Sequence, residues 1–463
     1  MPIDLTSIEV KSTHEVFVGL KVIFSGIINM SERASYQCPM GNEMATECTG
    51  RYVITFAVDR VSEGLAALRR SAGIGKLPSA ADFQDSAIDV AQADTAGGAV
   101  FPNMGVAVVS LDEESFQSAS SLPGEESSIL DIEPERMFYA LGCQGPQADY
   151  LRGYRDGVSD LVGRLSGDAS EGSENAAASF ADDAASTWGL KATRVMNSRW
   201  TGRGIRIAVL DTGFDLLHPD FRGRSIVSRS FVANETAQDG NGHGTHCVGT
   251  ACGGKDLNGR RYGVASDSLI YAGKVLPNAG RGGMTSGILA GMEWAVENGC
   301  HVISMSLGNL FTTPSTAYTT AAQRALARGS LIVAAAGNHR QTVPNPPGLV
   351  GQPANSPFVL AAGSLNNQLQ LSPFSCRSGS VQGGNVDIAA PGSNVYSSFP
   401  MSTRYAVLNG TSMATPHVAG IAALYAEAFR ASGAQLWQLV TSRAQRLLID
   451  SRDVGAGLVQ APV

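Results

Sequence analysis

Short apolar segments alternate with helical segments through the second half of the chain, and this alternation constrains the fold more than any other feature. Apolar runs of strand length lie at residues 205–210, 269–274, 301–305, 331–335 and 358–362. Helical patterns lie at residues 285–298, 315–328 and 415–431. Apolar strands separated by helices predict a mostly parallel sheet covered on both faces, which is a three-layer α/β domain.

Catalytic side chains on such a sheet are expected at strand ends and helix starts. Asp211 ends the apolar run IRIAVLDTG, and Asn338 ends the run LIVAAAGN. His243 lies between two glycines at the start of the helical stretch NGHGTHCVGT. Ser412 follows Gly-Thr in GTSMATPHVAG, at the start of an apolar helical run.

This set of residues predicts nucleophilic catalysis by Ser412. Backbone N–H groups at a helix start are unpaired, and the helix dipole favours a developing negative charge there. A serine hydroxyl also needs a histidine that takes its proton and a carboxylate that holds the histidine, roles that His243 and Asp211 can fill. The amide of Asn338 can donate to an oxyanion together with the N–H of Ser412.

Each of these residues also has a purely structural interpretation. Asp211 could form an Asx turn at a strand end, and both His243 and His246 could be buried structural histidines. His243 is predicted to be the base because its flanking glycines permit close approach of a substrate, whereas His246 is expected to pack. His218 is expected to be a turn residue.

The segments DTG, HGTH, AAGN and GTSMATPHVAG resemble the sequence blocks of the subtilisin (subtilase, peptidase S8) family of serine endopeptidases, in the family's order. The similarity runs from about residue 188 to the C-terminus. It implies a subtilisin-like three-layer fold, a triad of Asp211, His243 and Ser412, and Asn338 in the oxyanion hole. HGTHC is also found in proteinase K-like and kexin-like members, where the cysteine that matches Cys247 lies beneath the histidine; a small buried hydrophobe is the alternative role.

The resemblance also implies where a substrate binds. An extended peptide can add a strand to an exposed sheet edge. The implied edges and the wall of the S1 pocket are Arg281, Gly282 and Gly283, then Ser306, Leu307 and Gly308, and finally Ala335, Ala336 and Gly337. Gly351 is expected at the pocket floor, where it leaves room for a large apolar P1 residue, although ordinary turns are the alternative for these glycines.

Residues 51–140 have the pattern of a small α+β domain. Strands are expected at 51–58, 105–111 and 129–141, helices at 62–73 and 113–122, and a variable insert at 78–102. This order resembles the inhibitor-I9-like, ferredoxin-like prodomain of subtilases, including a closing strand before an IEPE-like turn. The resemblance implies that the chain's own N-terminal domain is an intramolecular inhibitor; an unrelated α+β domain is the alternative.

The remaining segments complete the predicted domain organisation. Residues 1–50 form an extension of unclear role, and residues 187–463 form the catalytic domain. Residues 141–186 form a linker that combines a helical pattern at 149–165 with an acidic run at 166–186 that has almost no apolar anchors. A proteolytic cut is expected in this acidic run.

Charge and composition bear on partners and location. A net charge of −7 disfavours nucleic acid and anionic membranes as main partners. No run of about 18 or more apolar residues predicts a membrane span. The N-terminus lacks a basic region before an apolar core, so we expect a cytoplasmic location, with export by another route left open. The seven cysteines fit reduced thiols, although Cys38 and Cys48 could pair in an oxidising compartment.

No cofactor is expected to take part in the chemistry. The resemblance implies a structural calcium ion at Asp220, because this residue matches a carboxylate that many subtilases use for that metal. The loop at 253–263, which should supply further ligands, does not align well with the family.

The sequence therefore predicts a serine endopeptidase, made as a self-inhibited zymogen, that cleaves protein or peptide substrates through an acyl-enzyme. A dedicated maturation protease for one partner precursor is an alternative, because the N-terminal extension is unusual. An inactive binding protein on the same scaffold is another. Its signature would be the loss of a catalytic position, yet Asp211, His243, Asn338 and Ser412 are all present.

Overall fold

The computed structural model describes residues 48–83, 90–124, 126–141, 179–341 and 348–463. All of these residues fall in one compact unit. The predicted helix at 149–165 and nearly all of the extension at 1–50 lie outside the described residues. Within the described part of the chain, no helix is both long and apolar enough to cross a membrane.

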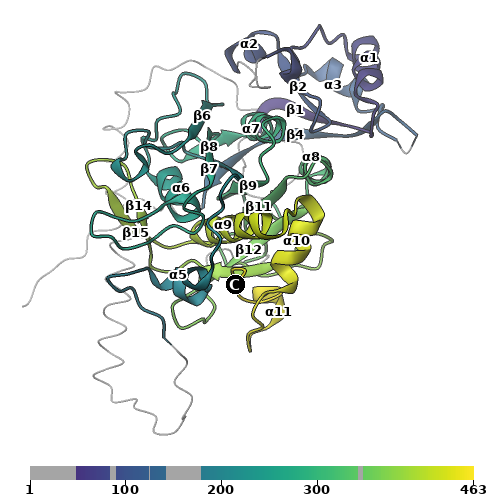
Figure 1. The fold of residues 1–463 in the computed structure, drawn as a ribbon. Helices are drawn as coiled ribbons and strands as arrows, with labels where there is room; N and C mark the ends of the chain where they lie inside the picture. The colour runs from purple at the N-terminus through teal and green to yellow at the C-terminus, as the bar shows by residue number, and fades with distance from the viewer. Residues whose placement is uncertain (1–47, 84–89, 125, 142–178, 342–347) are drawn as a thin grey trace, which may run out of the picture. The chain divides into compact units, whose positions relative to one another are not determined.

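A seven-stranded sheet forms the centre of the larger part of the molecule (Figure 1). Its order is β13-β12-β11-β9-β5-β7-β6, and every neighbouring pair is parallel. The predicted parallel sheet is therefore confirmed, with β6 and β13 as edge strands that the sequence pattern did not reveal. In chain order the strands are β5 (Arg206–Asp211), β6 (Ile226–Ser230), β7 (Leu269–Lys274), β9 (Val302–Met305), β11 (Leu331–Ala335), β12 (Val359–Leu365) and β13 (Ile388–Pro391).

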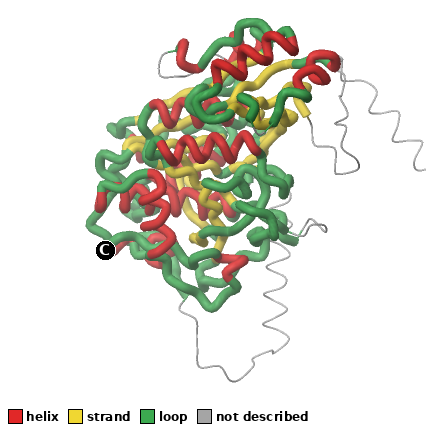
Figure 2. The backbone as a smooth tube through the Cα atoms, turned by 90° about the vertical axis from the view of Figure 1, so that its right-hand side faces the viewer, coloured by secondary structure: helices red, strands yellow, loops and turns green. Residues whose placement is uncertain are grey.

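Helices cover both faces of this sheet, as Figures 1 and 2 show. Successive side chains of a strand point to opposite faces. Ala208 and Leu210 of β5 accordingly join the core beneath α7 (Thr285–Glu297) and α8 (Thr316–Ala327). Ile207 and Val209 join the core beneath α6 (His243–Cys252), α9 (Thr411–Phe429) and α10 (Gly433–Ser442). The three-layer α/β architecture is confirmed.

A four-stranded antiparallel sheet forms the N-terminal region, in the order β4-β1-β3-β2. The predicted strands and helices are present, and the described part of the expected insert at 78–102 holds a short 3-10 helix (Ala80–Asp82) as well as α2 and β2. The elements are β1 (Cys48–Phe56), α1 (Val61–Ala72), α2 (Val90–Thr95), β2 (Gly98–Phe101), β3 (Val106–Ser110), α3 (Glu113–Ala119) and β4 (Ile129–Ala140).

The predicted turn at IEPE was wrong, because residues 132–135 lie inside β4. Pro134 sits opposite Tyr52 of β1, next to a shift in the pairing register between Cys48 and Tyr52. Proline cannot donate to a sheet ladder, but its fixed φ is compatible with an extended strand next to an irregularity. The strand therefore continues through the proline.

Strand β4 extends beyond its own sheet and pairs with two short edge strands of the larger region. It lies antiparallel to β8 (Arg281–Met284) and to β10 (Leu307–Gly308). A hairpin of β14 (Val395–Ser398) and β15 (Tyr405–Leu408) and the short helices α5 (Trp188–Ala192) and α11 (Ser451–Val454) complete the elements used below.

Candidate active site

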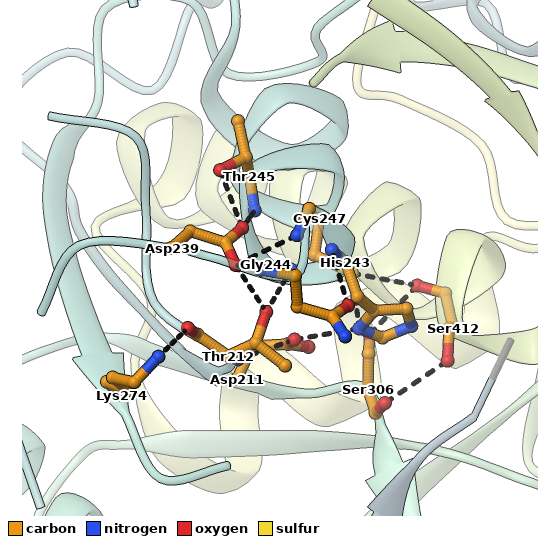
Figure 3. A network of polar contacts seen from close by, with 12 residues as sticks. Asp211, Thr212, Asp239, His243, Gly244, Thr245, Cys247, Lys274, Ser306 and Ser412 are labelled. Carbon is orange, nitrogen blue, oxygen red and sulfur yellow. Dashed lines mark hydrogen bonds and ion pairs between the residues drawn. The ribbon is translucent and has the colours of Figure 1, made fainter. Parts of the chain in front are cut away.

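Asp211 and His243 meet at the carboxyl edge of the central sheet. Asp211 is the last residue of β5 and His243 is the first residue of α6. The Asp211 Oδ1 atom lies 2.7 Å from His243 Nδ1, and the backbone N–H of Thr212 donates to the same oxygen at 2.7 Å. Both side chains are buried. The carboxylate therefore holds one ring nitrogen of His243 and leaves Nε2 on the other side of the ring (Figure 3).

Ser412 is the second residue of α9, and its backbone carbonyl lacks the usual helical hydrogen bond because of a proline. Pro416 lies four residues later and has no N–H, so it cannot make the helical hydrogen bond to the Ser412 carbonyl. The Ser306 hydroxyl donates to this carbonyl at 2.8 Å, and the Cys247 thiol lies 3.5 Å from it. The start of α9 is thus fixed by side chains from two other segments.

Cys247 connects the serine with the histidine. Its sulfur lies 3.5 Å from the Ser412 carbonyl oxygen and 3.9 Å from His243 Nδ1. Burial raises the pKa of this thiol to about 11, so it is neutral and unreactive near pH 7. This geometry supports the interpretation of Cys247 as a small buried hydrophobe that packs between the two residues.

The Ser412 hydroxyl donates to the backbone carbonyl of Ser306 at 3.1 Å (Figure 3). Ser306 lies between β9 and β10, beside the predicted cleft. A rotation about the Cα–Cβ bond of Ser412 would redirect the hydroxyl. The hydrogen bond to the Ser306 carbonyl therefore belongs to one rotamer of the Ser412 side chain.

Asn338 is held in one orientation by Thr411, the residue before Ser412. Its Oδ1 atom accepts hydrogen bonds from the Thr411 backbone N–H at 2.9 Å and from the Thr411 hydroxyl at 2.8 Å. This assignment directs the Asn338 NH₂ group away from Thr411. The backbone N–H of Gly337 donates to the same threonine hydroxyl at 3.2 Å. Thr411 therefore couples the end of the β11 segment to the start of α9.

Asp239 is a site residue that the sequence analysis missed. One of its oxygens accepts from the Thr212 hydroxyl at 3.0 Å and from the Gly242 N–H at 2.9 Å, and the other accepts from the Thr245 N–H at 2.8 Å and its hydroxyl at 2.7 Å. It thus ties the turn after Asp211 to the first turn of the helix that carries His243 (Figure 3). An aspartate just before a helix start is a capping signal that could have revealed it.

Lys274 is a second missed residue, at the end of β7. Its buried Nζ atom donates to the Thr212 carbonyl at 2.6 Å and to Asn278 Oδ1 at 2.7 Å, and it lies 3.1 Å from a Glu235 oxygen. A buried ammonium is stable only when its donors are satisfied. Here it fixes the backbone of the residue that follows Asp211.

The predicted cleft edges hold the end of β4. Tyr139 pairs with Gly308 on one side and with Arg281 on the other, so the strand lies between β10 and β8. The N–H of Leu141 donates to the Ser306 carbonyl at 3.2 Å. Because the Ser412 hydroxyl donates to that same oxygen, Leu141 lies next to Ser412.

The Leu141 side chain lies against a predicted pocket residue. A Cβ atom added to Gly308 would lie 2.9 Å from Leu141 Cδ1 and 3.0 Å from the Gln352 carbonyl oxygen. A Cβ atom on Gly351 would lie 2.0 Å from the Asn309 carbonyl oxygen. Both glycines therefore leave space that a side chain would fill. The Leu141 side chain occupies the space at Gly308, and the Asn309 backbone occupies the space at Gly351.

The other predicted substrate-binding residues divide into two groups. Gly283 and Leu307 pair directly with β4, at Phe138 and Ala140, whereas Gly282 lies at a register irregularity between paired residues. Ala335, Ala336 and Gly337 lie at the buried end of β11, and a contact between them and a substrate stays a prediction.

The two other histidines of this region are structural. His246 is buried and its Nε2 atom hydrogen-bonds the Val395 carbonyl at 3.0 Å, while burial lowers its pKa to about 3. His218 precedes a short turn of helix, where its ring accepts from the Asp220 N–H and contacts the Arg404 carbonyl at 2.9 Å. These positions agree with the prediction that His246 packs in the interior and that His218 is a turn residue.

The surroundings of Asp220 do not fit the calcium site that the family resemblance implied. Arg404 donates to Asp220 Oδ1 at 3.1 Å, and the hydroxyls of Tyr405 and Tyr262 donate to Oδ2 at 2.9 and 3.1 Å. Donors of the chain occupy both oxygens, and a guanidinium supplies the positive charge that a metal would bring. Among the described residues, the only group of three or more His, Cys, Asp and Glu side chains close enough to share an ion is Asp211, His243 and Cys247.

Comparisons with known proteins identify the family of the chain. The model of the subtilase family matches residues 202–457. Subtilisin from Bacillus pumilus is 42% identical over 237 residues, which cover 51% of this chain and 81% of the relative. M-protease from Shouchella clausii (strain KSM-K16) is 44% identical over 241 residues, 51% of this chain and 58% of the relative.

One solved structure, of a cold adapted subtilisin-like serine proteinase, is 36% identical in sequence. The match covers 58% of this chain and 92% of that one, with a TM-score of 0.49. The family model alone spans more than half of the chain, and the first relative is matched over most of its length. The chain therefore belongs to the subtilase family of serine endopeptidases.

Proposed function

We propose that this endopeptidase is made as a self-inhibited zymogen, in which a prodomain at residues 51–140 occupies the cleft of a catalytic domain at residues 187–463. The observation that carries this proposal is the end of β4. It is paired on both sides by cleft strands, and the N–H of Leu141 donates to the carbonyl of Ser306. An enzyme of this family binds peptides as an added strand, so β4 lies as a product would lie.

The chemistry follows from the polar site. After rotation of its hydroxyl, Ser412 attacks the scissile carbonyl while His243 Nε2 takes the proton. Asp211 holds the Nδ1–H side of the ring and stabilises the imidazolium. The NH₂ group of Asn338 and the N–H of Ser412 stabilise the oxyanion. His243 then returns the proton to the leaving amine, and water hydrolyses the acyl-enzyme.

The proposed processing site is the peptide bond that follows Leu141. Leu141 takes the position of P1, the residue that supplies the scissile carbonyl, because its N–H pairs with the carbonyl that Ser412 also contacts. This site lies at the first residue of the predicted linker, upstream of the acidic run at 166–186 where the cut was expected. The composition of the acidic run indicates that any protease could reach it. In the proposed zymogen, in contrast, the cleft places one particular peptide bond, the one after Leu141, next to Ser412.

The bound strand also supports a preference for apolar residues at two substrate positions. Leu141 at P1 packs against Gly308. Phe138, three residues earlier at P4, is fully buried and meets the ring of Tyr318 edge-on at 5.4 Å between centroids. We expect efficient substrates to carry a large apolar P1 residue and an aromatic or large apolar P4 residue.

Two glutamates of β4 support the assignment of an intramolecular partner. Glu135 accepts from the backbone N–H of Ser286 at 2.8 Å, in the first turn of α7. Glu133 accepts from the backbone N–H of Ala317 at 3.3 Å and from the Ser315 hydroxyl, at the start of α8. Carboxylates are stabilised at helix starts by unpaired N–H groups and by the helix dipole.

The far ends of the same helices contact the N-terminal region through side chains of the catalytic domain. Glu293 of α7 accepts from the backbone N–H groups of Asn103 at 3.0 Å and Met104 at 2.9 Å. Arg324 of α8 donates to the Phe56 carbonyl at 3.0 Å and the Ala57 carbonyl at 3.2 Å. Each helix therefore contacts the prodomain at both ends, through backbone N–H groups at its start and through a Glu or Arg side chain toward its far end.

Inhibition in trans tests this proposal. The fragment of residues 46–141, shown by circular dichroism to be folded, is titrated against the self-processed enzyme with a chromogenic peptide as substrate. We expect competitive inhibition that weakens when Leu141 and Phe138 are both replaced by Ala. A folded fragment that does not inhibit, even far above the enzyme concentration, would contradict the zymogen proposal.

A further inference from the structure

We propose that Phe311 forms a substrate subsite for a cationic side chain, Arg or Lys, at the sixth residue before the scissile bond (P6). The inference rests on the proposed function, because it takes β4 as a bound product. Counting back from Leu141 at P1, P6 is Arg136. The Arg136 guanidinium carbon lies 3.5 Å from the centroid of the Phe311 ring.

The backbone at this position is bound in a way that any peptide could reproduce. The Thr285 hydroxyl accepts from the Arg136 N–H at 3.2 Å and donates to the Arg136 carbonyl at 3.1 Å. The next residue, Met137, pairs with Met284 of β8. A substrate in the same register therefore places its P6 backbone at Thr285, and its P6 side chain beside Phe311.

The ring selects for a cation because of its charge distribution. The face of an aromatic ring is negative, so it attracts a guanidinium or an ammonium group. The Arg136 Nε atom is buried and has no hydrogen-bond partner among the described residues, which fits a guanidinium that lies against a ring. Glu133 also attracts Arg136, but it belongs to the prodomain and is absent from a separate substrate.

The backbone of Phe311 is held by residues outside β4. Its N–H donates to Asn309 Oδ1 at 3.1 Å. Its carbonyl accepts from the Gln352 N–H at 3.0 Å and from the Asn355 side chain at 2.9 Å. A backbone held by three hydrogen bonds lowers the ordering cost of presenting the ring to a substrate.

Peptide kinetics with the self-processed full chain test the subsite. Internally quenched peptides carry the residues of 137–141 at P5 to P1 and Arg, Lys, Met or Glu at P6. We expect kcat/KM for the Arg and Lys peptides to exceed that for the Met peptide by roughly three- to tenfold. The Glu peptide should be the slowest, and the differences should appear mainly in KM because the ring does not touch the reacting atoms.

Two variants complete the test. Phe311→Leu should remove the preference for a cation, so that the ratio of kcat/KM between the Arg and Met peptides falls to about one. Leu310→Ala, at an exposed neighbour in the same loop, should keep the preference. Equal rates for the Arg and Met peptides, or an unchanged preference in Phe311→Leu, would overturn the subsite while peptide hydrolysis stands. Failure to cleave any peptide would overturn the proposed function and the subsite with it.

Discussion

The polar centre around His243 and the cleft around β4 are held by different means. Around His243, buried side chains such as Asp239 and Lys274 bond to backbone groups of neighbouring turns, and both partners of these bonds lie within residues 187–463. Around β4, backbone pairing and charges at helix ends join two regions that are far apart in the sequence.

This difference predicts different responses to substitution. A preorganised centre loses rate when one donor is removed, because the donor acts on the transition state. Under the zymogen proposal, a docked prodomain should lose affinity when one contact is removed, while catalysis by the released enzyme should remain. Separate measurements of turnover and of inhibition therefore distinguish the two regions.

The largest effect is expected from Asn338→Ala. The Asn338 NH₂ group is oriented by Thr411, so its removal should lower kcat by about 10² to 10³ with little change in KM. Steady-state kinetics on one peptide substrate give both values. A loss confined to KM would show that Asn338 binds the ground state of the substrate instead. Thr411→Val, which removes only one of the two orienting bonds, should have a smaller effect on kcat.

The buried histidine of α9 should make the catalytic domain sensitive to acid. Burial lowers the pKa of His417 from 6.5 to about 4, so the folded state keeps the ring neutral. Its contribution to stability is complete above pH 6.5 and is lost as the pH falls to about 4, which amounts to about 3 kcal/mol. His246, with a pKa of about 3, acts in the same direction.

Denaturant unfolding of the Ser412→Ala protein between pH 7 and 4 measures this loss without self-digestion. His417→Gln in that background should be less stable at pH 7 and should show a shallower decline toward acid. If both proteins lose the same free energy of unfolding over this range, the decline comes from other groups.

A smaller effect is expected at the docking surface. Arg324→Ala removes a guanidinium that donates to the carbonyls of Phe56 and Ala57, and charged hydrogen bonds of this kind contribute about 1.5 to 3 kcal/mol. The inhibition constant of the prodomain fragment should therefore rise about 10- to 100-fold, with kcat unchanged. Arg328→Ala is the matched control, because Arg328 makes a long exposed bond of 3.5 Å to Asn103. Equal effects of the two variants would contradict the specific role of Arg324.

The smallest effect is expected for calcium at Asp220. The Arg404 and tyrosine donors already occupy this carboxylate, so Asp220→Asn should change the free energy of unfolding equally with calcium and with a chelator. Thermal unfolding in the two buffers measures the difference. A stabilisation by calcium that disappears in Asp220→Asn would show that the ion displaces Arg404.

The sequence predicted the parts of the fold that depend on local pattern. Apolar runs predicted β5, β7, β9, β11 and β12. The family motifs predicted the site residues Asp211, His243, Asn338 and Ser412. Strand β2 was missed because its residues 98–101 follow a run rich in alanine and aspartate, with no clear period. The turn expected at Pro134 was wrong because pairing with β1 outweighs the local preference of proline.

The parts of the site that depend on distant segments could not be predicted. Lys274 is an ordinary lysine in the sequence, and only the fold brings its ammonium to the Thr212 carbonyl. In the sequence, Phe311 is an ordinary aromatic residue of a loop, and only the fold places Arg136 of β4 over its ring. The proposed processing site shows the same limit. The acidic run at 166–186 has the composition of a cut site, whereas Leu141 is placed next to Ser412 only by the fold.

The mass of the N-terminal fragment tests whether the chain cuts itself after Leu141. The purified full chain and its Ser412→Ala form are incubated side by side, and intact fragments are weighed by mass spectrometry. We expect a fragment that ends at Leu141 in the parent and no such fragment in Ser412→Ala. A parent fragment that ends within 166–186, or identical fragments from both proteins, would rule out self-cleavage after Leu141.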